Sequence, residues 1–137
     1  MNIHLKVSNL IPQRPPFIFI DEISEVSHEH LISTFEIKAD TLLCAEGYLR
    51  EAGIMENIAQ SAAAHIGYES SETSSIGVIG SVKNFHIYTL PKIGQLLHTH
   101  IRIINEVFNI VFLKAEVKVQ DQLIATCEMK VAIAFDK

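Results

Sequence analysis

The sequence predicts an α+β domain in which one curved antiparallel sheet wraps around a single long central helix. Three observations indicate this fold class: an apolar helical pattern in the middle of the chain, a pair of short β-favouring segments before it, and four long β-favouring segments after it. The chain has 137 residues, without an internal repeat or a linker-like composition. We therefore expect a single domain over residues 1–137.

The first two β-favouring segments are predicted to form a hairpin. Two prolines in "RPPFIFIDEISEV" favour an extended backbone, and β-favouring residues follow from Phe17 to Ile23. After a short polar break, "HLISTFEIK" places Leu31, Phe35 and Ile37 on one face. Such alternation is typical of a half-buried strand, so the two segments are expected to pair.

Apolar residues at helical spacing predict a helix from Glu51 to about Tyr68. They cover most of its circumference, so this helix should be buried on several sides. Gly67 and the polar segment "ESSETSS" are expected to end it.

Four candidate strands follow: "SIGVIGSVKNFHIY", "QLLHTHIRIINEV", "IVFLKAEVKVQ" and "QLIATCEMKVAIAF". Tight turns are predicted at "EVFN" and "QDQ". In the third segment Ala115, Val117 and Val119 alternate with charged residues, which indicates one face in the core and one in water. A sheet this large around one helix leaves an edge open, so we expect a dimer.

Composition excludes several classes of partner. The net charge of −5 argues against nucleic acid, which needs a basic stripe. No apolar run reaches the roughly 20 residues of a membrane-spanning helix, so we expect no membrane partner. The first residues lack the apolar core of a signal peptide, which indicates the cytoplasm. Cys44 and Cys127 show no CxxC or zinc spacing, so we expect free thiols and neither a metal nor a cofactor.

The unusual feature of the helix is Glu56, a carboxylate in an apolar segment one turn before Gln60. The two side chains share a helix face. Glu56 is either an acid tuned by burial for proton transfer or a structural carboxylate satisfied by the Gln60 amide. The residues alone leave both interpretations open.

Other candidates lie around the start of the helix. Gly53 would let a substrate approach the helix N-terminus and its free N–H groups. Cys44 is either a nucleophile or an inert packed thiol, and Glu46 is either a replacement base or a solvated carboxylate. His98 and His100 point the same way on a strand, which suits a solvated face better than a metal site.

Two motifs carry a family resemblance. In "LIPQRPPFIFIDEI" the matching positions are Pro12, Arg14, Pro16, Phe17 and Asp21, and in "ENIAQ" they are Glu56 and Gln60. In this order and spacing they resemble the 3-hydroxyacyl-(acyl-carrier-protein) dehydratases of fatty-acid synthesis. The resemblance implies the hotdog fold, an acyl thioester substrate on acyl carrier protein, and the catalytic acid position for Glu56. It also implies substrate contacts for Gln60, for Phe85 and for His86, the one histidine that would serve as a substitute base.

The chain departs from that family where a G-H-F-P-G loop should supply the histidine that removes the α-proton. The corresponding stretch, "TLLCAEGYLREAGIME", contains no histidine. The chain therefore resembles a divergent branch found near aryl-polyene and related polyketide systems. Three functions remain open: a dehydratase-like lyase, a non-catalytic partner of a complete dehydratase, or a hotdog thioesterase. The assembly is expected to be a homodimer or a heterodimer with a related hotdog subunit.

Overall fold

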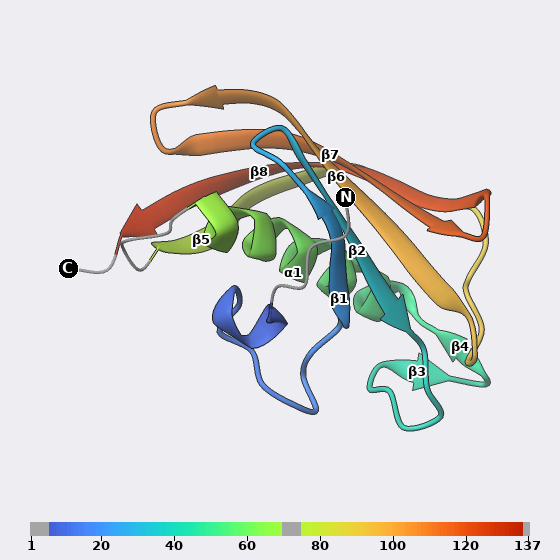
Figure 1. The fold of residues 1–137 in the computed structure, drawn as a ribbon. Helices are drawn as coiled ribbons and strands as arrows, with labels where there is room; N and C mark the ends of the chain where they lie inside the picture. The colour runs from blue at the N-terminus through green and yellow to red at the C-terminus, as the bar shows by residue number, and fades with distance from the viewer. Residues whose placement is uncertain (1–5, 70–74, 136–137) are drawn as a thin grey trace.

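The computed structural model describes residues 6–69 and 75–135, and it confirms the predicted fold class (Figure 1). One helix packs against a six-stranded antiparallel sheet of order β1-β2-β6-β7-β8-β5, and a separate two-stranded sheet pairs β3 with β4. The elements are a short 3₁₀ helix (Val7–Asn9), β1 (Glu22–Val26), β2 (His30–Glu36), β3 (Cys44–Ala45), β4 (Tyr48–Leu49), α1 (Glu51–Glu69), β5 (Ser75–Ile87), β6 (Leu96–Val107), β7 (Ile110–Val119) and β8 (Gln122–Phe135).

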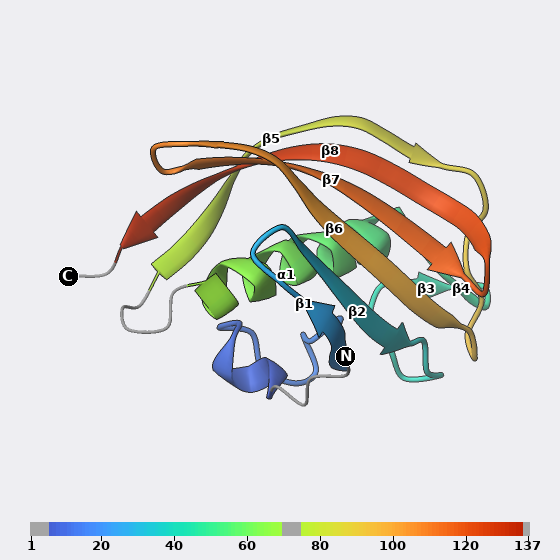
Figure 2. The same ribbon diagram turned by 45° about the horizontal axis from the view of Figure 1, so that its top comes forward.

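The sheet curves over α1 so that one face of every long strand lines the core (Figure 2). Ile54 and Ile58 of α1 are fully buried, as are Leu97 and Ile101 of β6. On β7, Ala115 and Val117 are buried while Lys114 and Lys118 are exposed, which confirms the predicted alternation. The helix also has the predicted bounds to within a residue. The described helix is not of the length and apolarity that a bilayer crossing requires.

The N-terminal hairpin forms, but its first strand begins later than the sequence predicts. Residues from Phe17 to Asp21 are β-favouring, yet β1 begins only at Glu22. Asp21 is already tied to β2, because its N–H donates to the Thr34 carbonyl (2.7 Å) and its side chain accepts the Glu36 N–H (2.7 Å). The residues before it bond to α1 instead, as described below.

The last four strands lie where the sequence predicts them, with turns at Phe108–Asn109 and Gln120–Asp121. Their order in space is less regular, because β5 lies at the far edge beside β8. Along this edge Val78 (53 %), Ile79 (43 %) and Val82 (39 %) are substantially exposed. The sheet therefore ends in a long strand whose outer side has no partner within the described chain.

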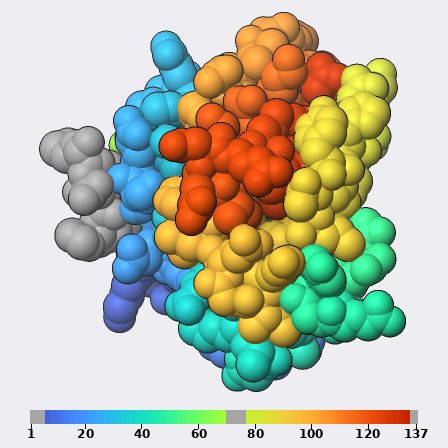
Figure 3. Space-filling model, turned by 90° about the vertical axis from the view of Figure 1, so that its right-hand side faces the viewer, coloured from blue at the N-terminus to red at the C-terminus, as the bar shows by residue number. Residues whose placement is uncertain are grey.

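The segment that replaces the histidine loop forms a small hairpin of β3 and β4 directly before α1. Its turn, Glu46–Gly47, has φ of 56° and 87°, as a two-residue hairpin turn requires. Leu49 donates its N–H to the Pro91 carbonyl (3.0 Å), and Ile93 donates to the Gly47 carbonyl (2.9 Å). Figure 3 shows this hairpin, in blue-green, packed below the neighbouring parts of β5 and β6. The hairpin is thus fastened to the sheet by backbone bonds.

Two histidines meet on the outer face of the sheet. His30 of β2 and His100 of β6 share a hydrogen bond between Nδ1 and Nε2 (3.1 Å). Burial lowers the pKa of His100 below its ordinary value of 6.5, and Arg102 and His30 lower it further against the weaker effects of Glu116 and Glu25. Within the described ranges, no three His, Cys, Asp or Glu side chains converge in a way that could hold a metal ion.

This histidine pair predicts a loss of stability in mild acid. Because the pKa of His100 is lower in the folded state, the unfolded chain takes up the proton first as the pH falls. Stability should fall as the pH drops below about 6.5, and His100→Gln should flatten that slope. Urea denaturation between about pH 7 and about pH 5 measures it. His98→Gln, two residues away on the same face, is the matched control. Equal slopes for wild type and His100→Gln would contradict the prediction.

Candidate functional site

Gln60 is the best-anchored polar side chain of the helix, with 1 % exposure. Its Oε1 accepts the N–H of Phe19 (2.7 Å), and its Nε2 donates both to the Phe17 carbonyl (2.9 Å) and to Glu56 Oε1 (2.9 Å). These three bonds fix which way the amide points. They also explain why the segment 17–21 does not extend β1, since its backbone groups are bonded to a helix side chain.

A second side-chain amide of α1, that of Asn57, also bonds the helix to the N-terminal segment. Asn57 donates Nδ2 to the Phe19 carbonyl (2.7 Å), and its Oδ1 accepts the hydroxyl of Thr99 on β6 (2.5 Å). Ser61 donates to the Asn57 carbonyl (2.8 Å) and lies 2.7 Å from the hydroxyl of Ser33 on β2. Because buried polar groups need partners, this stripe ties β2, β6 and the N-terminal segment to one face of α1.

Of this stripe, only Glu56 and Gln60 are predicted from the sequence as candidate site residues. A signal was present, since Glu56, Asn57, Gln60 and Ser61 stand at spacing i, i+1, i+4, i+5 in an otherwise apolar helix. That spacing puts all four on one side of a helix. Their partners could not be identified in the same way, because they lie 28 to 43 residues away in the chain.

Glu56 lies at the open end of the stripe and is half-buried. The Gln60 amide reaches it as a donor, because the oxygen of that amide is already held by the Phe19 N–H. Oε1 of Glu56 is therefore an acceptor of the Gln60 amide, and Oε2 is the oxygen not used in that bond. Such an oxygen either accepts a proton or, when the carboxyl is protonated there, delivers one.

Gly53, which the sequence predicts as a point of substrate approach, is covered by a neighbouring side chain at the start of α1. A Cβ at Gly53 would collide with the side chain of Leu49, so close helix packing accounts for this glycine. The pKa of Glu51 is lowered by a hydrogen bond from its own backbone N–H, and the nearby Arg50 lowers it as well. A carboxylate thus already occupies an amide that a thioester carbonyl would use.

Cys44 and Glu46 both belong to the β3–β4 hairpin. Cys44 is half-buried, and burial raises the pKa of its thiol. A raised thiol pKa leaves less thiolate, which favours the packed, inert interpretation over the nucleophile. Glu46 is exposed at the tip of the hairpin.

Phe85 and His86 lie next to each other near the end of β5 but differ in environment. Phe85 is partly buried against the core. His86 is exposed and lies opposite Thr126 on β8, whose two neighbours along the strand are buried. The His86 ring stacks on Tyr88 (6.5 Å between centroids) on the outer face of the sheet. His86 and Glu56 are therefore on opposite sides of the sheet within one protomer.

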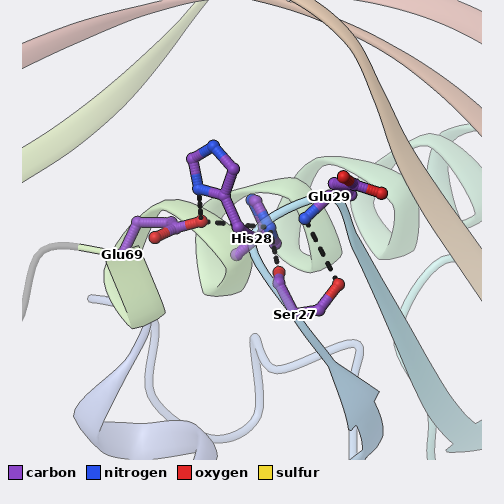
Figure 4. A network of polar contacts seen from close by, with 5 residues as sticks. Ser27, His28, Glu29 and Glu69 are labelled. Carbon is purple, nitrogen blue, oxygen red and sulfur yellow. Dashed lines mark hydrogen bonds and ion pairs between the residues drawn. The ribbon is translucent and has the colours of Figure 1, made fainter.

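A different polar group lies at the far end of α1, where Figure 4 shows Ser27, His28 and Glu69. His65 of the helix belongs to this group. Nε2 of His65 donates to the Ser27 carbonyl (2.9 Å). Oε1 of Glu69 lies 2.6 Å from His28 Nδ1 and also faces His65 Nε2. This group fastens the helix end to the β1–β2 turn. His65 therefore lies at the end of the helix, bonded to Ser27 and close to Glu69, and is not a partner of Glu56.

The chain matches one protein family over almost its whole length. The model of the ApeP-like family, described as ApeP dehydratase, matches residues 5–136. No curated protein matches the sequence. Among solved structures, the dehydratase heterocomplex ApeI:P from Xenorhabdus doucetiae aligns with a TM-score of 0.80 at 16 % identity, covering 95 % of this chain and 91 % of that one.

Two further structures share the hotdog fold. smu.793 from Streptococcus mutans UA159, solved with acetyl CoA, has a TM-score of 0.73 at 18 % identity, over 94 % of this chain and 99 % of that chain. A hypothetical thioesterase from Streptococcus pneumoniae TIGR4, solved with coenzyme A, has a TM-score of 0.69 at 12 % identity, over 85 % and 87 %. At such identities these likenesses establish the fold alone.

The anchoring role of Gln60 predicts a clear difference between two neighbouring substitutions. Gln60→Leu should lower the free energy of unfolding by about 2–3 kcal/mol, because it leaves the Phe19 N–H and the Phe17 carbonyl without partners. Glu56→Gln keeps an acceptor for Gln60 at a half-exposed position and should cost about 0.5 kcal/mol or less. Urea denaturation of both variants measures this. Equal losses would show that Gln60 is not the anchor.

The raised thiol pKa of Cys44 predicts low reactivity in the native state. Cys127→Ala removes the other cysteine, whose thiol pKa burial raises to about 11. In that variant, Cys44 should react with a disulfide reagent more slowly in the folded state than in urea at the same pH. A native rate above the unfolded rate would reverse the interpretation and support a nucleophile.

Proposed function

Because this chain belongs to the ApeP-like dehydratase family, we propose that it is the acid-bearing subunit of a dehydratase that acts on 3-hydroxyacyl thioesters carried by acyl carrier protein. The observation that carries this proposal is the carboxylate of Glu56, held through Oε1 by Gln60 with Oε2 left for a substrate. Dehydration needs both an acid for the leaving hydroxyl and a base for the α-proton. Glu56 fits the first role.

The base is proposed to come from another subunit. Six histidines lie in the described ranges, and none of them faces Glu56. His28 and His65 are at the far end of α1, and the others are on the outer face of the sheet. In the elimination, the external base takes the α-proton, the C–O bond breaks, and Glu56 gives the proton from Oε2 to the departing hydroxyl. The products are an enoyl thioester and water.

The open edge of the sheet supports this assembly. The strand β5 has 13 residues and is paired with β8 on one side, and its outer side, with exposed Val78, Ile79 and Val82, is suited to pairing with an equivalent strand. A half-buried apolar strip runs along α1 next to Glu56, and it is formed by Met55, Ala59 and Ala63. A second hotdog subunit paired through β5 would cover this strip and enclose an acyl chain there. We propose a heterodimer with a complete dehydratase, and a homodimer is the alternative.

A complementation assay tests the proposal. The companion is a complete dehydratase whose own helix carboxylate has been replaced by glutamine, so that it is inactive alone. Adding the wild-type chain should restore conversion of a 3-hydroxyacyl thioester to the enoyl product, and Glu56→Gln should reduce that activity by at least about 100-fold. Glu51→Gln, at an exposed carboxylate of the first helical turn, is the matched control and should restore activity fully.

Two results would overturn this assignment. Full restoration by the Glu56→Gln variant would mean that the chain supports its companion without chemistry. Release of free thiol without enoyl product would identify a thioesterase, in which Glu56 guides water instead of protonating a hydroxyl.

A further inference from the structure

The outer face of the sheet, opposite α1, ends in an apolar extremity at the β6–β7 hairpin, which projects beyond the helix (Figure 1). Phe108 at its turn is 97 % exposed, and Ile104 (60 %) and Val107 (45 %) lie beside it on β6. Ile110 and Phe112 continue the surface onto β7. We call these five residues the apolar tip. Two shallow hollows adjoin it, and both are lined by Phe112 and Lys130.

Phe108 is costly for the fold in two ways. It occupies the two-residue turn between the paired Val107 and Ile110 with φ of 54°, a left-handed conformation that disfavours a bulky residue. Its side chain is almost wholly exposed, so no burial within the protomer offsets this strain. Glycine is the residue preferred where the first turn position has positive φ. No contact within the described residues accounts for an aromatic ring at this position.

A band of positive charge lies behind the apolar tip. A row of directly paired residues crosses the sheet from β6 through β7 and β8 to β5, and it consists of Arg102, Lys114, Glu128 and Lys83. One register row nearer the tip, Lys130 Nζ lies 5.8 Å from the centroid of the Phe112 ring. In all, five cations and two carboxylates stand on the outer face of β5 to β8: Lys83, Arg102, Lys114, Lys118 and Lys130, with Glu116 and Glu128.

This face has the opposite charge to the whole chain, which carries −5. Of its two carboxylates, Glu128 is engaged by the amide of Asn84. Glu106, which also lies near the tip, is paired with the buried Val111 and so belongs to the helix side of the sheet. The outer face thus presents a cationic field, and the partner that complements it is anionic.

The order of the residues along the strands favours a lipid surface over a protein. Ile110 and Lys114 are four residues apart on β7, which corresponds to about 14 Å. Segments that lie in a membrane interface bury apolar groups roughly 5–10 Å deep, with lysine and arginine at the level of the headgroups. A protein interface has a polar rim around its apolar centre. Here the turn holds Phe108 with one polar residue, Asn109, and the cations lie behind the apolar tip and not around it.

We propose that the β6–β7 hairpin is a peripheral membrane contact, in which the apolar tip enters the interface of an anionic lipid surface and the cationic band binds the headgroups. The lack of an apolar run of spanning length predicts no membrane partner. A hairpin that lies in the interface needs no spanning segment.

The absence of tryptophan from the chain allows a direct test. Phe108→Trp places a single indole at the apolar tip. Its fluorescence should shift to the blue with vesicles of phosphatidylglycerol and phosphatidylcholine in equal parts, and much less with phosphatidylcholine alone. Tyr88→Trp is the matched control, because Tyr88 is 60 % exposed beyond the far end of β5. Its emission should not shift.

Two further variants separate membrane binding from folding. Phe108→Gly removes the ring and relieves the strained turn, so the protein should stay folded while its affinity for the anionic vesicles falls at least tenfold. Lys83→Glu with Lys114→Glu should weaken binding by a further factor of about five for each charge lost. Lys38→Glu, at an exposed position outside the sheet, is the control and should bind as the wild type does. Sedimentation with vesicles measures all of these.

Three outcomes would overturn the proposal. The first is the absence of both sedimentation and a blue shift at low salt. The second is a fall in the molecular mass of the assembly, by light scattering, in Phe108→Gly, which would assign the apolar tip to contact between copies. The third is a spectral shift with an acidic carrier protein and none with vesicles, which would assign the face to a protein partner.

Discussion

The carboxamide of Gln60 is the interaction on which the arrangement of this site depends. It is buried, and each of its hydrogen bonds ends on a group that would otherwise be unsatisfied or free to move. Two of those groups are the backbone of Phe17 and Phe19, and the third is the carboxylate of Glu56. One side chain therefore sets the path by which the N-terminal segment enters β1 and the direction in which the acid points. Removing it would disturb both, because a buried amide or carbonyl without a partner is costly.

The parts of the fold that the sequence predicted are those that a local pattern records. The bounds of α1 and of the four long strands follow from periodicity, because burial of one face repeats along each element. The start of β1 does not follow, since Phe17 to Asp21 has the composition of a strand but gives its hydrogen bonds to Gln60 and Asn57. The edge position of β5 does not follow either, because no local pattern shows which strand lies beside β8. The β3–β4 hairpin has strands of two residues, too short to produce alternation.

The candidate site divides in a similar way. Glu56 and Gln60 were identified because a polar pair in an apolar helix is conspicuous and because their motif resembles a known family. Gly53 was assigned to substrate approach, whereas the structure gives it a close contact with Leu49 that sequence spacing cannot show. His86 was considered as a base because it follows Phe85, but the alternation of β5 turns it to the other face of the sheet. Proximity along the chain is a poor guide here, since adjacent strand residues face opposite sides.

The polar stripe also explains how a chain can lack the histidine loop and keep a well-placed acid. In the described residues, the bonds that orient Glu56 come from the helix itself and from the segment 17–19, and the stripe extends to β2 and β6. The β3–β4 hairpin, which stands in place of the loop, is fastened separately by backbone bonds to Pro91 and Ile93. Leu49 of the hairpin packs against α1 at Gly53, but the hydrogen bonds that hold Glu56 and Gln60 involve no residue of the hairpin. A change in the hairpin therefore leaves in place the hydrogen bonds that orient Glu56, which is what the proposed acid-bearing subunit requires.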